Sequence, residues 1–562
     1  MAFQLSPGVL VTERDLTSVV PAVATTAGGF VGAFAWGPVA DVTTVDSENA
    51  LVDRFGKPNS DTFRSFFTAA NFLSYGNNLQ VIRVVNEATA KNATSNTGAS
   101  SILIKGEDHY ATNFFAGGLG LFGPWAAKYP GTLGNSLKVS MADANTWSTW
   151  GYAGNFDSAP STSTYVSDLG GSHDEMHVIV IDEDGRFSGT AGAVLEKFPF
   201  VSKAFDAKKS DGTASYYKEV INNSSKYIWW MDHTANVASG TSWGSSANAS
   251  AFANLTANVT ISLAGGVSAD TPTDGNIMSG LAIFANDEAY DISLLPLGNA
   301  SATVVNYAIS SVAEVRKDCI VFASPEYADV VGGTGSEASD VTSFRDTLTS
   351  SSYAVLDSGW KYQYDRYNDL YRWVPLNGDT AGLAVRTDFV ADPWFSPAGF
   401  NRGQVKNVVK LAYSPSKTDR DTLYKKGVNP IVSFPGQGTV LFGDKTLLAK
   451  PSAFDRINVR RLFIVLEKAI ATAAKFQLFE FNDPFTRAQF RNLVEPFLRD
   501  VQGRRGITDF KVVCDETNNT GEVVDRNEFV ADIFVKPARA INFIQLNFIA
   551  TRSGISFEEV GA

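Results

Sequence analysis

The last hundred residues of the chain carry its strongest pattern, because two long helices are followed there by strands. Apolar residues recur at three- and four-residue steps over residues 459–473, which is the spacing of one helical face. Asp483 and Pro484 then form an N-cap and first-turn pair for a second helix, within which Pro496 is expected to cause a kink or a break. Strands are predicted at 510–514, 528–537 and 541–551. This order predicts a C-terminal α/β domain in which helices pack on a mixed sheet.

Both ends of the chain have the pattern of strands that have no local partner. Residues 9–13 follow a Ser-Pro-Gly turn, and residues 555–560 come last. An unpaired strand is an aggregation hazard unless another chain takes it up, so pairing across subunits is its natural use. The alternative is that both ends pack on their own domain or fray. The candidate subunit-interaction residues are Val9, Val11, Glu13, Ile555, Phe557 and Val560.

Helices and strands alternate in the rest of the chain, which favours layered α/β structure. Residues 29–85 predict a strand, two helices and a further strand. Residues 91–172 are rich in Asn, Thr, Ser, Ala and Gly, which is typical of short strands and long loops. Alternating elements resume after residue 173, and they include a broadly helical segment at 189–205 that Pro199 interrupts.

The chain has 562 residues, far more than the roughly 100–200 of one domain, so we expect an α+β fold with several nested domains. Residues 1–20 are expected to form an N-terminal arm that belongs with an inner core domain at 400–562. The other predicted domains are an α/β connecting domain at 21–90 plus 345–399, an exposed β-rich domain at 91–172 and an outer α/β domain at 173–344.

Charge is distributed unevenly along the chain. The net charge is −12, but the segment from Arg402 to Arg505 holds 19 Lys and Arg against 9 Asp and Glu. Such a basic stretch is either a solvated face or a docking surface for a negatively charged partner. No nucleic-acid motif accompanies it, so we expect no direct nucleic-acid contact. Cys319 and Cys514 lie in apolar runs, which predicts buried free thiols rather than disulfides.

Several short motifs resemble catalytic or metal sites without their structural context. The GxGxxG match at 118–123 is not preceded by a β-branched strand, and Pro124 follows it. His173 and His177 have the acidic residues in the wrong order for a zinc helix, and 182–185 predicts a tight turn rather than a calcium loop. We therefore expect no enzyme, no cofactor, no metal and no membrane insertion, although paired acids for glycoside cleavage stay open.

Residues 454–552 carry a more specific signal. The segments that carry it are NVRRLF at 458–463, EKAI at 467–470, FEFND at 479–483, CDETNNT at 514–520 and KPARAINFIQLNF at 536–548, with SPGVLVTE and AGGFVGAFAWGP near the N-terminus. Together they resemble the tail sheath proteins of contractile bacteriophages, and most closely the T-even-like branch. Within residues 91–344 we recognise no motif of this family, and the resemblance implies that its outer domains vary.

This resemblance implies a structural subunit that polymerises as stacked six-fold rings around a tail tube and contracts, which drives the tube through the host envelope for genome delivery. The implied partners are further copies of the chain, the tail tube protein, and baseplate and tail terminator proteins. The implied location is the virion tail, after assembly in the host cytoplasm. Each end of the chain would complete the sheet of a neighbouring subunit.

By the same resemblance, the C-terminal domain faces the tube, and a basic helix there meets an acidic tube surface. The tube-facing candidates are Arg487, Arg491, Arg499, Arg504 and Arg505. Alternatively, these residues form ion pairs with Glu480, Glu495 and Asp500.

Two other functions stay open at this point. A sheath of a phage-derived bacteriocin or secretion machine would share these sequence features. A β-rich carbohydrate-active enzyme or fibre is suggested by Trp125, Trp147 and Trp150, if these side chains are exposed among the polar residues around them.

Overall fold

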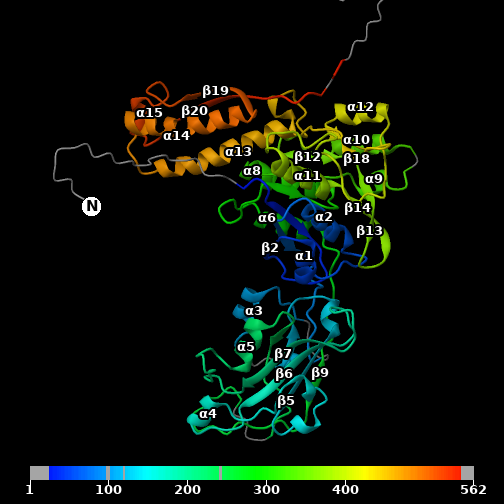
Figure 1. Cartoon of the computed structure of the whole chain (residues 1–562), viewed down its shortest axis with the longest axis vertical. Coiled ribbons are helices and arrows are strands. Elements are labelled where there is room, and N and C mark those ends of the chain that lie inside the picture. Colours follow the sequence, from blue (N-terminus) through cyan, green and yellow to red (C-terminus); the bar gives the residue numbers. More distant parts are fainter. Residues whose placement is uncertain are drawn as a thin grey trace, which may run out of the picture. The chain divides into compact units, whose positions relative to one another are not determined.

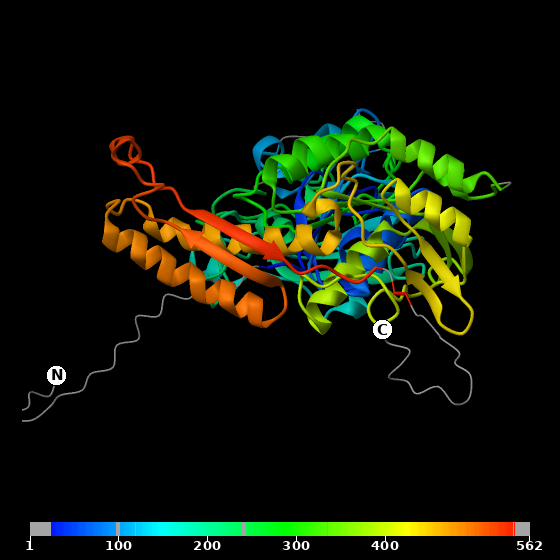
Figure 2. The same cartoon turned by 90° about the horizontal axis from the view of Figure 1, so that it is seen from above.

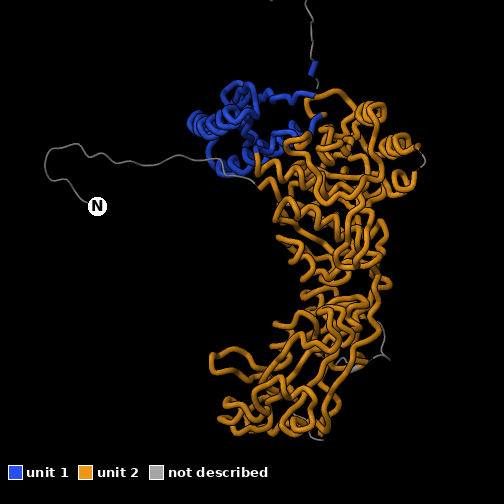
Figure 3. The backbone as a smooth tube through the Cα atoms, turned by 45° about the vertical axis from the view of Figure 1, so that its right-hand side comes forward, with its two compact units in different colours: residues 1–23, 391–396, 456–562 blue, residues 24–390, 397–455 orange. Residues whose placement is uncertain are grey.

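The computed structural model describes residues 24–96, 102–117, 120–238, 243–333, 335–542 and 544–545 (Figures 1 and 2). Its contacts divide the described chain into two units, which Figure 3 colours separately. The larger unit comprises Ala24–Val390 and Pro397–Asp455, and the C-terminal unit comprises Ala391–Ser396 and the described residues from Arg456 onward. The predicted N-terminal arm at 1–20 lies outside the described residues.

A seven-stranded sheet organises the larger unit, in the order β16-β12-β11-β10-β1-β3-β2. Neighbouring strands pair in parallel, except that β2 is antiparallel to β3. The strands are β1 (Gly28–Gly32), β2 (Val42–Val45), β3 (Leu79–Arg83), β10 (Leu294–Pro296), β11 (Ile320–Ala323), β12 (Ala354–Asp357) and β16 (Val428–Asn429). The core strands are short apolar runs because a parallel sheet is covered on both faces.

Alternation along β1 shows how the two faces are covered. Gly28 and Phe30 point to the face that holds α2 (Phe63–Leu73), where a Cβ on Gly28 would lie 2.6 Å from the Phe72 ring. Val31 points to the opposite face, where it approaches Gly280 of α6 (Asp274–Ile283). A second helix, α11 (Asn377–Val390), packs beside α2.

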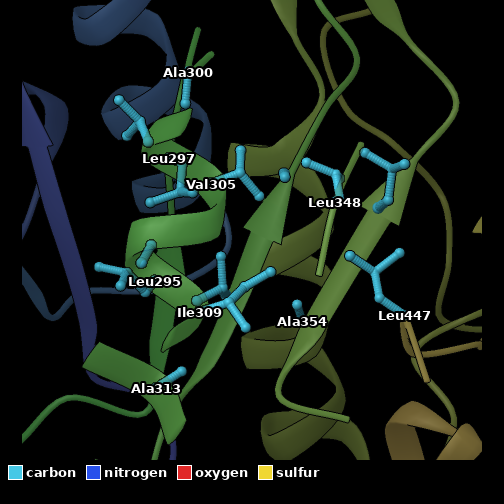
Figure 4. Close-up of a cluster of buried hydrophobic side chains, with 14 of the residues drawn as sticks. Leu295, Leu297, Ala300, Val305, Ile309, Ala313, Leu348, Ala354 and Leu447 are labelled. Atoms are coloured by element: carbon cyan, nitrogen blue, oxygen red, sulfur yellow. The ribbon is translucent and has the colours of Figure 1, made fainter. Parts of the chain in front are cut away.

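The core on the α6 face continues through a helix of three parts, α7 (Ala302–Tyr307), a π-helical turn (Ala308–Ala313) and α8 (Glu314–Arg316). Leu295, Val305 and Ile309 pack there, and Figure 4 shows them with Ala354, Leu348 and Leu447 from distant segments of the chain. Segments before residue 100 and after residue 420 thus share one hydrophobic core.

Asp357 is a buried carboxyl group at the end of β12. Ser324 Oγ donates a hydrogen bond to its Oδ2 at 2.7 Å, and the Gly359 amide donates to its Oδ1 at 2.9 Å. Burial outweighs these bonds and raises the pKa of Asp357 from 3.8 to about 8. The folded chain therefore keeps a proton there that the unfolded chain releases above pH 4.

The stability of the larger unit is expected to fall as pH rises from 4 to 8, and Asp357 supplies up to about 1.4 kcal/mol of this loss per pH unit. Asp357→Asn removes the titrating proton, so its stability relative to the wild type should improve steadily across this window. Thermal unfolding of both proteins at several pH values measures the difference. A difference that stays constant with pH would contradict the assignment.

A second sheet, which is antiparallel, lies in the middle of the sequence. Its order is β7-β6-β5-β9, with β5 (Leu137–Asp143), β6 (Glu175–Asp182), β7 (Ala193–Ser202) and β9 (Val259–Ser262). Beside it, β4 (Trp125–Ala127) pairs with β8 (Ile228–Trp230). Its core contains Val139, Val178 and Val180 at under 1% exposure.

The structure corrects the predicted domain boundaries. Since β5 and β6 pair over seven residues, a boundary between 172 and 173 would cut one sheet. Residues 294–323 belong to the seven-stranded sheet rather than to a separate outer domain. Residues 397–455 belong to the larger unit rather than to a core domain at 400–562, since β16 pairs with β12.

The segment at 189–205, which we expected to be broadly helical, contains strand β7 instead. It pairs with β6 and is irregular where Pro199 lies, between the partners Val178↔Phe198 and Met176↔Val201. Proline has no amide proton to donate, so a bulge accommodates it without losing a required bond. The β6 neighbour overrides the helical propensity of the Ala, Leu, Glu and Lys residues in this segment.

Tryptophan side chains of the middle region pack in hydrophobic cores. Trp125 is 0% and Trp150 is 4% exposed, and Trp147 is half-buried against a small core around Ile179. The expectation of exposed tryptophans is therefore wrong. The stacking platforms that would favour a carbohydrate-binding protein are absent at these three positions.

Further helices and strands complete the larger unit. The helices are α1 (Glu48–Phe55), α3 (Glu107–Asn113), α4 (Thr164–Asp168), α5 (Tyr217–Ser224), α9 (Tyr327–Val330), α10 (Glu337–Asp346) and α12 (Lys417–Lys425). The strands are β13 (Trp360–Asp365), β14 (Leu370–Pro375), β15 (Lys410–Leu411), β17 (Ile431–Phe434) and β18 (Gly438–Leu441).

The C-terminal unit has the two predicted helices and a two-stranded ribbon (Figure 2). Its elements are α13 (Ile457–Ala474), α14 (Pro484–Gly503), β19 (Ile507–Val513), α15 (Gly521–Asp525) and β20 (Asp532–Pro537). Asp483 caps α14 by accepting a bond from the Thr486 amide at 2.8 Å, as predicted. The third predicted strand, at 541–551, lies largely outside the described residues.

Pro496 does not split α14, which is assigned as one helix from Pro484 to Gly503. Proline removes the bond to the carbonyl four residues earlier, which belongs to Asn492. Asn492 and Pro496 are both exposed, so water can satisfy that carbonyl. The predicted multidomain α+β fold class is confirmed, with the domain boundaries redrawn as above.

Candidate functional site

The β19–β20 ribbon is the first candidate surface of the C-terminal unit. Its strands pair antiparallel from Ile507↔Pro537 to Val513↔Asp532, with an irregularity between Ile507 and Asp509. Among the described residues, no third strand pairs with either outer edge. A lone two-stranded ribbon is marginal in water, and its open edges can accept further strands.

One face of the ribbon lies on the helices, and the other is exposed. Ile533 and Val535 are half-buried against a core that includes Phe490, Val494 and Leu498 of α14. Phe534, between them, is 59% exposed. The helices thus hold the ribbon from one side and leave both edges available to other chains.

The predicted arm residues lie outside the described part of the chain. This holds for Val9, Val11, Glu13, Ile555, Phe557 and Val560. The structure therefore describes the ribbon that the arms would join, and the arms themselves stay a prediction.

Arg487 is not presented to solvent, in contrast to the other tube-facing candidates. It is 7% exposed, and its Nε donates a hydrogen bond to Asn482 Oδ1 at 2.8 Å. Its Nη2 donates to the Asn482 carbonyl at 3.2 Å. Arg487 therefore holds the turn before α14, and its charge reversal would perturb the fold as well as any interface.

The other four candidates lie at or near the surface. Arg491 is half-buried, whereas Arg499, Arg504 and Arg505 are exposed. Arg499 lies 3.5 Å from Glu495, and Arg504 contacts both Asp500, at 3.5 Å, and Asp392. Pairing with Glu495 and Asp500 was the alternative left open by the sequence, and the structure contains both pairs. Exposed pairs of this kind contribute roughly 0–1 kcal/mol, so they do not prevent these side chains from meeting a partner.

A surface that the sequence analysis missed lies between α13 and α14. Residues 475–485 form a turn, hereafter the aromatic turn, that begins with the short helix Lys475–Gln477. Its exposed apolar side chains are Phe476, Leu478, Phe479, Phe481 and Phe485. The sequence did contain a signal for this surface. Five large apolar residues fall within the ten positions 476–485, and their spacing fits neither a helix nor a strand.

The motifs that resembled catalytic or metal sites have structural roles. His177 is 0% exposed, stacks on Phe156 at 4.3 Å and accepts a bond from the Phe200 amide at 3.0 Å. Asp182 accepts bonds from the Phe187 and Ser188 amides, which closes the turn after β6. Gly118 lies outside the described residues. Within the described ranges, no cluster of three metal-ligating side chains occurs.

Both cysteine side chains, those of Cys319 and Cys514, lie buried in the interior, as the sequence predicted. No helix in the described segments is long and apolar enough to span a membrane.

The sequence of each unit contains a segment that matches a domain of one class of viral structural protein. The phage tail sheath protein central domain matches residues 270–447, and the phage tail sheath C-terminal domain matches residues 449–551. Full-length relatives agree, as the tail sheath protein of Vibrio phage KVP40 is 36% identical over 99% of both chains. That of Enterobacteria phage T4 is 32% identical over 99% of both chains. The chain belongs to the phage tail sheath protein family, which confirms the resemblance.

Solved structures show the same fold at low sequence identity. A sheath tail protein from Listeria innocua aligns with a TM-score of 0.53 and 12% identity, covering 91% of this chain and 94% of its own. The helical sheath of the anti-feeding prophage in its contracted state aligns with a TM-score of 0.51 and 13% identity, covering 98% and 100%.

Proposed function

We propose that this chain is the sheath subunit of a contractile phage tail, which polymerises as stacked six-fold rings around a tail tube. Contraction of the sheath drives the tube through the host envelope for genome delivery. Its partners are further copies of itself, the tail tube, and baseplate and tail terminator proteins. The subunit is assembled in the host cytoplasm and resides in the virion. Family membership supports this proposal, and the open ribbon of the C-terminal unit carries its assembly mechanism.

Strand addition joins the subunits in this proposal. Residues 9–13 of one neighbour and 555–560 of another extend the β19–β20 ribbon at its two edges, where the described residues supply no third strand. Each added strand pairs backbone groups that would otherwise stay open, at roughly 0.5–1.5 kcal/mol per hydrogen bond. The arms keep the lattice connected while the subunits move.

Contraction is a change between two packings of the same polymer. Contacts with the tube hold the subunits apart in the extended state, and release at the baseplate lets the rings rotate and approach. Rigid-body movement between interfaces of similar energy is an established route for large transitions. The driving free energy comes from contact between subunits, so no nucleotide hydrolysis and no enzymatic activity are required.

Electron microscopy of the purified chain tests this function. The proposal expects hollow tubes of sheath diameter, whereas an enzyme or a fibre would stay a small oligomer or form solid filaments. A chain that remains monomeric at every concentration and salt condition would overturn the proposal. The sheath of a bacteriocin or secretion machine would also form tubes, and a phage origin is favoured here by the tail sheath relatives of phages KVP40 and T4.

The exposed arginines near the end of α14 are assigned to an acidic tube surface. Arg499→Glu combined with Arg505→Glu is expected to lower co-assembly with tube at least about tenfold, because attraction between the two surfaces becomes repulsion. Tube-free polymer should form normally. Sedimentation of sheath with preformed tubes measures the effect.

A matched control reverses two exposed lysines of the larger unit, with Lys417→Glu and Lys425→Glu on α12. This variant changes the net charge equally and should keep its co-assembly. Equal loss in both variants would show a net-charge effect, and no loss in the arginine variant would remove the assignment.

A further inference from the structure

The aromatic turn exposes more apolar surface than a free subunit needs. The exposed fractions are 74% for Phe476, 63% for Leu478, 105% for Phe479, 84% for Phe481 and 75% for Phe485. At about 150–250 Å² per aromatic side chain, this patch offers roughly 700 Å² of apolar area. The largest patch on a typical monomer is about 300–600 Å², and a stable interface buries about 800 Å² per partner. The apolar area of the turn alone is therefore close to the area that one partner buries in a stable interface.

Hydrogen bonds from side-chain amides hold the aromatic turn in place. Asn482 Nδ2 donates to Asn519 Oδ1 at 3.1 Å and to the Glu528 carbonyl at 2.8 Å. Asn519 is 3% exposed, and its own Nδ2 donates to the Val530 carbonyl at 2.7 Å. The turn is thereby tied to the loop between β19 and β20, and Figure 2 shows both at one end of the unit. Its shape is fixed before a partner arrives, which lowers the entropic cost of binding.

Backbone strain accompanies this exposure. Phe479 adopts a positive φ of 72°, which is uncommon for residues other than glycine. Strained positions cost about 1–3 kcal/mol and persist where the surrounding structure holds them. Here the strain accompanies a phenylalanine ring that is left fully exposed, which folding of one subunit alone does not explain.

The chemistry of the patch favours a permanent partner. Obligate interfaces between copies of a chain are more hydrophobic than interfaces that form and dissociate. A tube contact has to be released when the sheath contracts, and the exposed arginines of α14 suit such a reversible, charged contact. Within 475–485 the charged residues are only Lys475, Glu480 and Asp483.

We infer that the aromatic turn is a permanent contact between neighbouring copies of this chain, separate from both the arm contacts and the tube-facing arginines. This inference rests on the proposed polymerisation and names a further surface that takes part in it. A second copy covers the rings of Phe479 and Phe481, and the contact persists in both packings of the polymer.

A photo-crosslinking probe at position 479 tests the contact in the full-length chain. Phe479→p-benzoylphenylalanine leaves folding unchanged because the native ring makes no buried contact. Illumination of tube-free polymer is expected to give a covalent dimer of two copies on a denaturing gel. Polymer that gives no such dimer, or that gives crosslinks only within one chain, would overturn the inference and leave the proposed function standing. A second illumination with tube present would overturn it equally if the probe crosslinked only to tube. Absence of any polymer would overturn both.

A substitution pair provides an independent measurement. Phe479→Ser with Phe481→Ser should raise the critical concentration for polymerisation at least tenfold without changing the thermal unfolding of the subunit. Phe205→Ser, which removes a ring that is 53% exposed in the larger unit, should leave the critical concentration unchanged. An unchanged critical concentration in the double variant would overturn the inference.

Discussion

Deletion of residues 1–14 is expected to leave folded subunits that no longer polymerise. The deletion removes residues 9–13, the strand that we assign to an edge of the β19–β20 ribbon of a neighbour. About four backbone hydrogen bonds at roughly 1 kcal/mol each correspond to an approximately 10³-fold rise in the critical concentration. Sedimentation and electron microscopy measure the loss of polymer, and thermal unfolding verifies that the subunit is intact.

Proline substitutions separate strand pairing from other effects of the deletion. Leu10→Pro with Val11→Pro removes two consecutive amide donors. Consecutive amides of a strand point to opposite edges, so one of the two lost donors lies on the edge that pairs with the neighbour. The matched variant with Leu10→Ile and Val11→Ile keeps both donors and the β-propensity of the segment, and it should polymerise. Intact tubes from the deletion or from the proline variant would count against strand addition.

The second large effect concerns a buried ion pair between β13 and α11. Lys361 Nζ lies 2.8 Å from Asp379 Oδ2, with both side chains at 0% exposure, and it also donates to the Lys406 carbonyl at 2.9 Å. Lys361→Met leaves the Asp379 carboxylate buried without its cation. The expected cost is about 3–5 kcal/mol, which for a unit of this size corresponds to a Tm lower by roughly 3–6 °C.

Two further variants complete this test. Lys361→Met combined with Asp379→Asn removes both charges and keeps an acceptor for the Tyr75 hydroxyl, so it should recover most of the lost stability. Lys426→Met breaks an exposed pair with Asp346, also 2.8 Å long, and should cost under about 1 kcal/mol. If the double variant is no more stable than Lys361→Met alone, the loss of stability in Lys361→Met does not come from the unpaired charge of Asp379.

Local signals predicted the C-terminal unit well. The helical period of residues 459–473 and the cap formed by Asp483 and Pro484 depend only on residues close in sequence, and the structure contains both helices. Pro496 does not break the second helix, because Asn492 and Pro496 are exposed and water can satisfy the carbonyl that loses its bond. Exposure of this kind is a tertiary property.

Pairing between distant strands is what the sequence alone did not show. The compositional change near residue 172 reflects surface loops, whereas β5 and β6 on either side of it are adjacent strands of one sheet. The segment at 189–205 has good helix formers, yet the neighbouring strand decides its conformation. Such contacts follow from the whole fold rather than from a local window.

The candidate surfaces were predicted in part. The ribbon strands were predicted, but their lack of a third partner among the described residues is a structural observation. Arg487 and Arg499 both lie on the predicted helix and look alike in sequence, but in the structure Arg487 is buried and donates to Asn482. The aromatic turn was not predicted, because the exposure of its five large apolar side chains is a property of the folded unit.

The central claim is that one subunit is incomplete until neighbours extend its β19–β20 ribbon. A cryo-electron microscopy map of the assembled polymer measures this directly. We predict a four-stranded sheet in each C-terminal unit, with residues 9–13 from one neighbour and 555–560 from another at its two edges. A map in which both termini of every subunit fold back onto their own chain, with the ribbon edges unpaired, would contradict the account.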